Sequence, residues 1–318
     1  MHINAENDPG AFARISGRYM VMVNDLRKVY HMTLDTSYDQ MMHILSARGL
    51  EWVRRHVDAL PDPLPAGHDA VAPLSQAARL APVCSGLRGS VSPLEIFVRR
   101  RLDDRLVAEV CDLIRRKGAE PEICDTLAAA QGLGLGGGAL YRAIRDFCDR
   151  DDLDLAAQLA LQTRPAPPLL TAAEEWLRRP LSAAALTADR ADLFGRLVMQ
   201  IYGFGAQRPK LSTARAYGEI FENCLRIADW ALRRKDLTVL ARIIYCICLI
   251  DPDHDVGPWL SDIVASQRPD GSFPDRTGFG TQDQDFAVAG RSTIAAVAAL
   301  HMVRYRRWHK PPPDRMAA

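Results

Sequence analysis

Four aspartates within six residues form the first segment that could do chemistry: Asp149, Asp151, Asp152 and Asp154. Neighbouring carboxylates raise one another's pKa, so a buried cluster could hold a protonated aspartate that acts as a general acid. Carboxylates at the start of a helix are also favoured by the helix dipole and by water. The cluster therefore predicts either an acid site or a solvated helix start.

Two histidines mark further candidate positions. His301 lies on the apolar face of an expected helix over 291–308, which predicts a buried imidazole, or an acid or base if that helix lines a pocket. His254 lies between Asp253 and Asp255 in a compact loop, and carboxylates with an imidazole are ligands that a cation can take. The alternative for this loop is a solvated turn between two helices.

A glycine-rich segment at 132–138 contains the spacing Gly-x-Gly-x-x-Gly, with glycines at positions 132, 134 and 137. A dinucleotide site needs a β-strand before such a motif, whereas 121–131 has the pattern of a helix. We therefore expect a turn between helices here, and the cofactor is left unassigned.

The elements that must position these residues are helices, because apolar residues recur at steps of three and four along most of the chain. No alternating run bounded by turn signals predicts a strand. The expected helices cover 11–32, 38–60, 74–82, 93–117, 120–131, 139–149, 153–163, 171–178, 188–203, 212–234, 236–250, 257–267 and 291–308.

The composition is that of an ordinary globular protein. The chain has 318 residues, 48% of them hydrophobic and 25% charged, with a net charge of +1. Near-balance of charge argues against a general electrostatic grip on nucleic acid or on an anionic membrane. Of the 40 basic residues only five are lysines. A GC-rich bacterial genome explains this bias, and anion binding would require a specific arginine cluster.

The N-terminus and the cysteines favour a cytoplasmic protein. Residues 1–10 are polar and acidic, unlike a signal peptide. The longest apolar stretch considered, 237–250, is too short to span a membrane and contains Arg242. The seven cysteines are scattered and include no Cys-x-x-Cys pair, which is typical of reduced thiols.

A turn near the C-terminal end carries a family resemblance. Gln267, Gly271 and Phe273 match the spacing Gln, three residues, Gly, one residue, Trp or Phe. This pattern resembles the α/α-toroid families, which include terpenoid cyclases of the squalene–hopene type and protein prenyltransferases. Gln267 is expected to bond the free carbonyls that end its own helix, Gly271 to allow the turn, and Phe273 to fold back over it. The resemblance covers about 236–308.

The helical pattern predicts an all-α fold of about 11–13 helices. The resemblance favours an α/α toroid, and the alternative is an α/α superhelical array. We expect an N-terminal helical half over 1–163, a toroid-like half over 169–310 and a loose tail over 311–318. In class II terpenoid cyclases an Asp-x-Asp-Asp motif supplies the acid, so the resemblance would make Asp151 the proton donor, tuned by Asp149 and Asp152. The Thr-Ala that follows in that family is absent, and aromatic residues, which would line a carbocation pocket, make up only 7%.

These observations predict a cytoplasmic bacterial protein of small-molecule, natural-product biosynthesis. It would be an enzyme or an accessory subunit with a central apolar pocket and an unassigned reaction. One alternative is a class II-type cyclase that protonates an isoprenoid-like substrate through Asp151, and another is a non-enzymatic interaction scaffold. The expected partner is a small-molecule ligand or another protein of the pathway, with no nucleic acid, no membrane span and the oligomeric state open.

Overall fold

The computed structural model describes residues 37–86, 93–117, 121–148, 153–162, 165–205, 208–278 and 285–305. Within these ranges the chain forms thirteen α-helices and no β-strand, which confirms the all-α fold class. Contacts divide the chain into two compact units, Met1–Ile44 and Leu45–Ala318. The fold below is that of the second unit, and the expected boundary between two helical halves near Pro165–Pro168 stays a prediction.

The observed helices follow the expected ones closely, although the expected helix over 11–32 lies outside the described residues. They comprise a first helix over residues 37–58, α2 (Val71–Gly86), α3 (Pro93–Arg99), α4 (Asp104–Lys117), α5 (Pro121–Leu133), α6 (Gly137–Cys148), α7 (Leu155–Leu161), α8 (Pro167–Arg178), α9 (Ala188–Ile201), α10 (Ala214–Arg234), α11 (Leu237–Ile250), α12 (Gly257–Ala265) and α13 (Phe286–Tyr305).

One expected helix, 93–117, is wrong: it is divided into α3 and α4 by a break after Arg99. The carboxylate of Asp103 accepts a hydrogen bond from the backbone N–H of Leu106 at 2.8 Å, as the N-cap of a new helix does. Leu102, in the break, is completely buried. The apolar spacing continues across the break, so the periodicity alone concealed it.

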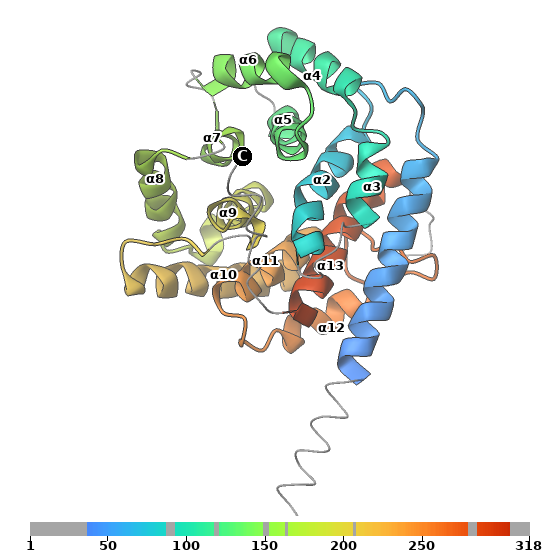
Figure 1. Ribbon diagram of the computed structural model, residues 1–318. Coiled ribbons are helices and arrows are strands. Elements are labelled where there is room, and N and C mark those ends of the chain that lie inside the picture. Colours follow the sequence, from blue (N-terminus) through green and yellow to red (C-terminus); the bar gives the residue numbers. More distant parts are fainter. Residues whose placement is uncertain are drawn as a thin grey trace, which may run out of the picture. The chain divides into compact units, whose positions relative to one another are not determined.

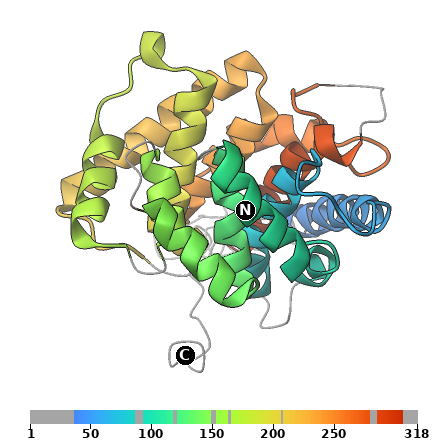
Figure 2. The ribbon, with the colours of Figure 1, turned by 90° about the horizontal axis from the view of Figure 1, so that it is seen from above.

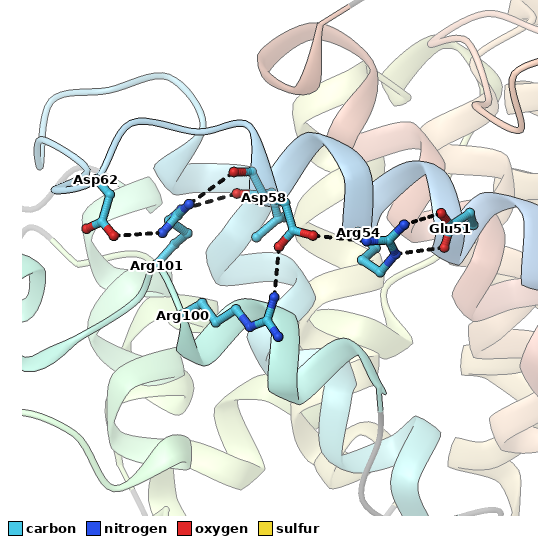
Figure 3. Close-up of polar contacts among 7 residues, drawn as sticks. Glu51, Arg54, Asp58, Asp62, Arg100 and Arg101 are labelled. Carbon is cyan, nitrogen blue, oxygen red and sulfur yellow. Dashed lines mark hydrogen bonds and ion pairs between the residues drawn. The ribbon is translucent and has the colours of Figure 1, made fainter.

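The break also places Arg101 against the C-terminal end of the helix over 37–58. Its guanidinium donates to the carbonyls of Val57 at 3.2 Å and Asp58 at 3.0 Å, and to the carboxylate of Asp62 at 3.1 Å. Arg100 pairs with the Asp58 carboxylate at 3.1 Å (Figure 3). Carbonyls that a helix leaves unpaired at its end are thus satisfied by a side chain from the next element.

Six helices of the second unit contact one another in a closed sequence. In chain order α2 contacts α5, α5 contacts α7, α7 contacts α9, α9 contacts α11, α11 contacts α13, and α13 returns to α2 (Figures 1 and 2). We call these helices the six-helix ring. The helices that alternate with them in the chain, α3, α4, α6, α8, α10 and α12, each contact at least one ring helix or a neighbour of one.

Two ring helices form the centre of the apolar core. Nearly every side chain of α11 is buried, and α13 is buried on most sides. Residues 286–304 of α13 are long and apolar enough to cross a membrane, but 83% of the apolar window is buried within the described structure. A core helix explains that composition, because a helix that is apolar all round must be covered on every side.

The turn after α12 shows how the Gln267 motif works, and the expectation for its glutamine was wrong. The Gln267 amide donates to the carbonyl of Leu45 in the first helix at 2.8 Å and to the carbonyl of Gly271 at 3.1 Å. It therefore joins two segments that are 222 residues apart rather than closing its own helix. Phe273 is fully buried, as expected.

The same turn is fastened to two helices. The backbone N–H of Phe273 donates to the Thr293 hydroxyl at 3.0 Å, and the Ser292 hydroxyl donates to the Phe273 carbonyl at 2.7 Å. On the other side the Trp52 indole donates to the Asp270 carboxylate at 3.1 Å. The turn thus connects α13 of the ring to the segment 45–58 of the first helix.

We expect Gly271→Ala to lower the free energy of unfolding by about 1–3 kcal/mol. Gly271 has a φ of +99°, and an added Cβ would lie 2.5 Å from the Arg48 carbonyl oxygen. The matched control is Gly218→Ala in the interior of α10, where a Cβ would meet no atom within 4 Å. This control should gain about 0.5–1 kcal/mol in urea denaturation. Equal effects of the two substitutions would contradict the assigned turn.

Candidate functional site

The cluster of four aspartates lies only in part within the described residues. Asp149, Asp151 and Asp152 are outside them. Asp154 is described, and it is the N-cap of α7: its carboxylate accepts from the backbone N–H of Ala157 at 2.6 Å and from the guanidinium of Arg196 at 3.3 Å. The acid role of Asp151 therefore stays a prediction.

The histidine candidates have structural surroundings. His301 is buried in α13, as expected, and lines neither of the two pockets described below. In the loop after α11, Asp255 accepts a hydrogen bond from the backbone N–H of Gly257 at 2.9 Å. The His254 ring lies 6.0 Å from the Trp259 ring, centroid to centroid. Among the described residues, Asp253, His254 and Asp255 do not form a group placed to hold a metal ion.

A pocket of about 110 Å³ lies among the helices of the six-helix ring. Its walls come from α2, α5, α9, α11 and α13, together with Phe204 in the short helical turn after α9. We call this space the arginine pocket. Its charged lining residues are Arg79, Arg196, Arg242, Arg291, Asp125 and Asp192. The ring thus encloses charged groups rather than only apolar ones.

One carboxylate joins two of the arginines. Asp125 of α5 forms a hydrogen-bonded ion pair with Arg79 of α2, and lies 3.6 Å from the NH2 atom of Arg196 of α9. Asp154 accepts from the NH1 atom of Arg196. The Nε atom of Arg196 is buried and has no hydrogen-bond partner among the described residues. Arg196 therefore keeps a donor to offer, although two carboxylates lie beside it.

Arg242 enters the pocket from α11 and forms an ion pair with Asp192 of α9. Its aliphatic stem runs over the backbone of α9 at Gly195, where an added Cβ would lie 2.7 Å from the Arg242 Cδ. A residue with no side chain at Gly195 therefore makes the space that Arg242 occupies. The glycine of α9 and the single arginine of α11 therefore pack against each other.

The buried arginines of the site are paired with carboxylates, but Arg196 keeps donor atoms without a hydrogen-bond partner among the described residues. The side chains of Arg79, Arg196 and Arg242 are nearly buried and lie against Asp125, Asp154 and Asp192. Burial lowers the pKa of the Arg79 and Arg242 guanidinium groups, and the charge of Asp125 opposes that change at both. Arginine still stays protonated near neutral pH, because its ordinary pKa lies far above neutral. The buried Nε and Nη2 atoms of Arg196 have no hydrogen-bond partner among the described residues, and an anion would accept hydrogen bonds from them.

A strained turn completes one wall. Phe204 has φ of 52° and ψ of 31°, a left-handed conformation that is unfavourable for a bulky side chain. The Tyr245 hydroxyl donates to the Phe204 carbonyl at 2.8 Å, which helps to hold the turn. In this conformation the Phe204 ring lies 4.8 Å from the Arg79 guanidinium carbon, in a cation–π contact. A strained backbone conformation at Phe204 therefore places an aromatic ring against the Arg79 guanidinium.

Sequence reasoning missed this site, although a signal was present. Arg242 is the lone charged residue of α11, an otherwise apolar helix whose side chains are almost all buried. Arg291 similarly begins the apolar part of α13. Buried arginines are uncommon unless they are paired or functional. The sequence has an excess of arginine, but the spacing of residues along one helix does not show which arginines from different helices meet.

No family model, no curated protein and no solved structure matches this chain. The site must therefore be judged by its own chemistry. In the described part of the second unit, exposed large apolar side chains lie on four different helices, at Ile96, Tyr141, Leu170 and Val288. The arginine pocket is accordingly the strongest candidate for a ligand site.

We expect Asp125→Asn to lower the stability of the free protein by about 1–3 kcal/mol, because it leaves Arg79 and Arg196 without a shared countercharge. Phosphate should then raise the melting temperature of this variant more than that of the wild type, since the anion replaces the lost charge. Melting curves in sodium phosphate and in sodium chloride of equal ionic strength measure the difference. Equal phosphate shifts for both proteins would contradict an anion site beside Asp125.

Proposed function

We propose that this chain binds a small anionic metabolite in the arginine pocket, as an enzyme or accessory subunit of small-molecule biosynthesis. The observation that carries the proposal is that the buried Nε and Nη2 atoms of Arg196, a lining residue, have no hydrogen-bond partner among the described residues. An arginine cluster without a ligand leaves charge poorly solvated, whereas a bound anion accepts hydrogen bonds from several guanidinium groups.

The size of the pocket limits what can enter it. About 110 Å³ is the volume of between three and four water molecules in the liquid, since each takes about 30 Å³. A phosphate group or a short carboxylate fits such a space. Arginines that come from α2, α9, α11 and α13 approach from different helices, which suits the several oxygens of a phosphate group.

We also propose that the chain is an α/α toroid, and the arrangement of its helices supports this interpretation. In the proposed toroid, the six-helix ring is the inner layer, and the helices that alternate with it are the outer layer. The expected ligand site of such a body is the space inside the ring, and the arginine pocket lies between ring helices. Its charged walls favour a hydrophilic anion over the isoprenoid-like substrate of the cyclase alternative.

We expect inorganic phosphate to bind the wild-type protein, and Arg291→Gln to weaken that binding about 10- to 100-fold. Arg291 is an exposed lining residue, so its substitution should leave the fold intact. Isothermal titration calorimetry measures the affinity, and circular dichroism checks the fold.

The matched control is Arg215→Gln. Arg215 is an exposed arginine on α10 that pairs with Glu219 and is not among the residues that line the pocket. It should leave phosphate affinity unchanged. Loss of affinity in both variants, or in neither, would sink the proposal that the arginine pocket is the anion site.

A further inference from the structure

A second and larger recess lies at the N-terminal ends of four ring helices. It has a volume of about 1050 Å³ and is bordered by the starts of α7, α9, α11 and α13, by the end of α10 and by residues 275–276. We call it the terminal groove. The N-caps of three of these helices, Asp154, Thr187 and Asp236, all lie along it.

The terminal groove adjoins the arginine pocket. Asp192, Arg196 and Arg291 line both spaces. These three side chains therefore stand at the junction between a small charged space and a large open one. For a ligand whose anionic group fills the small space, the groove is the adjoining space that could take the rest of the molecule.

The lining of the groove differs from that of the pocket. Asp189 and Asp275 are exposed carboxylates that make no hydrogen bond or ion pair with other described residues. Thr238 adds a half-buried hydroxyl. Carboxylates without partners accept hydrogen bonds, so this part of the groove suits a ligand that carries several donors.

The lining of the groove combines apolar side chains, such as Leu193 and Val288, with charged ones. Trp230 is largely buried, and the Arg234 guanidinium lies 5.7 Å from its ring centroid. The remaining charged side chain at the rim, Arg276, is exposed. An alkyl or isoprenoid chain laid here would desolvate charged groups without replacing their hydrogen bonds, which is unfavourable.

We propose that the ligand is a polyhydroxylated phosphate, of the sugar-phosphate or polyol-phosphate class. Its phosphate group occupies the arginine pocket, and its hydroxyl groups donate to the carboxylates of Asp189 and Asp275 in the terminal groove. This assignment rests on the proposed function, since it needs the phosphate group to bind in the arginine pocket. It adds the chemical class of the part that lies outside.

The test compares four probes by isothermal titration calorimetry on the full chain: inorganic phosphate, glucose 6-phosphate, hexyl phosphate and glucose. Glucose 6-phosphate should bind at least about 10-fold more tightly than inorganic phosphate or hexyl phosphate, because its hydroxyl groups add hydrogen bonds to charged carboxylates. Glucose alone, which lacks the anion, should bind more weakly than inorganic phosphate.

The double variant Asp189→Ala, Asp275→Ala should lose the advantage of glucose 6-phosphate and keep the affinity for inorganic phosphate. Both residues are exposed, so the fold should be little affected. Asp146→Ala, at an exposed aspartate on α6, is the control and should change neither affinity.

The outcomes separate the two proposals. If inorganic phosphate and glucose 6-phosphate bind equally, or hexyl phosphate binds as tightly as glucose 6-phosphate, the ligand class is wrong while the anion pocket stands. If the double variant keeps the full advantage of glucose 6-phosphate, the assignment of the two carboxylates is wrong. If no phosphate binds at all, the proposed function itself fails.

Discussion

Asp125 of α5 pairs with Arg79 of α2 and Arg196 of α9, and the arrangement of the site depends on these ion pairs between three ring helices. A guanidinium inside an apolar ring is costly unless a carboxylate or a ligand faces it. Asp125 supplies one such partner to two arginines at once. Asp154 also pairs with Arg196, yet the Nε atom of Arg196 stays without a hydrogen-bond partner among the described residues, and it is the donor that the proposed anion would use.

The surrounding elements hold this charged centre in position through unlike contacts. Gly195 leaves room for the stem of Arg242, and the strained turn at Phe204 lays an aromatic ring over Arg79. Both features lower local conformational stability. A glycine destabilises the helix that contains it, and a phenylalanine with left-handed backbone angles is strained. Local costs that serve one pocket are typical of functional sites rather than of plain core packing.

The turn at Gly271 joins the six-helix ring to the first helix of the chain. Its bonds to α13 hold one end of the ring, and its bonds to Leu45 and Trp52 join the first helix to the same end. The apolar helices α11 and α13 then fill the core on which the charged pocket rests. A motif that carries no chemistry in the families it resembles therefore holds α13 at Ser292 and Thr293, directly after the lining residue Arg291.

The sequence by itself determined the all-α class, most helix bounds, the glycine turn at Gly134 and Gly136, and the burial of Phe273, because periodicity, caps and turn residues are local signals. It could not show the break before α4, where apolar spacing runs on while Arg101 bonds a distant helix end. Nor could it show the partner of Gln267, or the meeting of Arg79, Arg196, Arg242 and Arg291. Only the tertiary structure decided these, since they depend on how separate helices pack, and a one-dimensional pattern records no distance between residues of different helices.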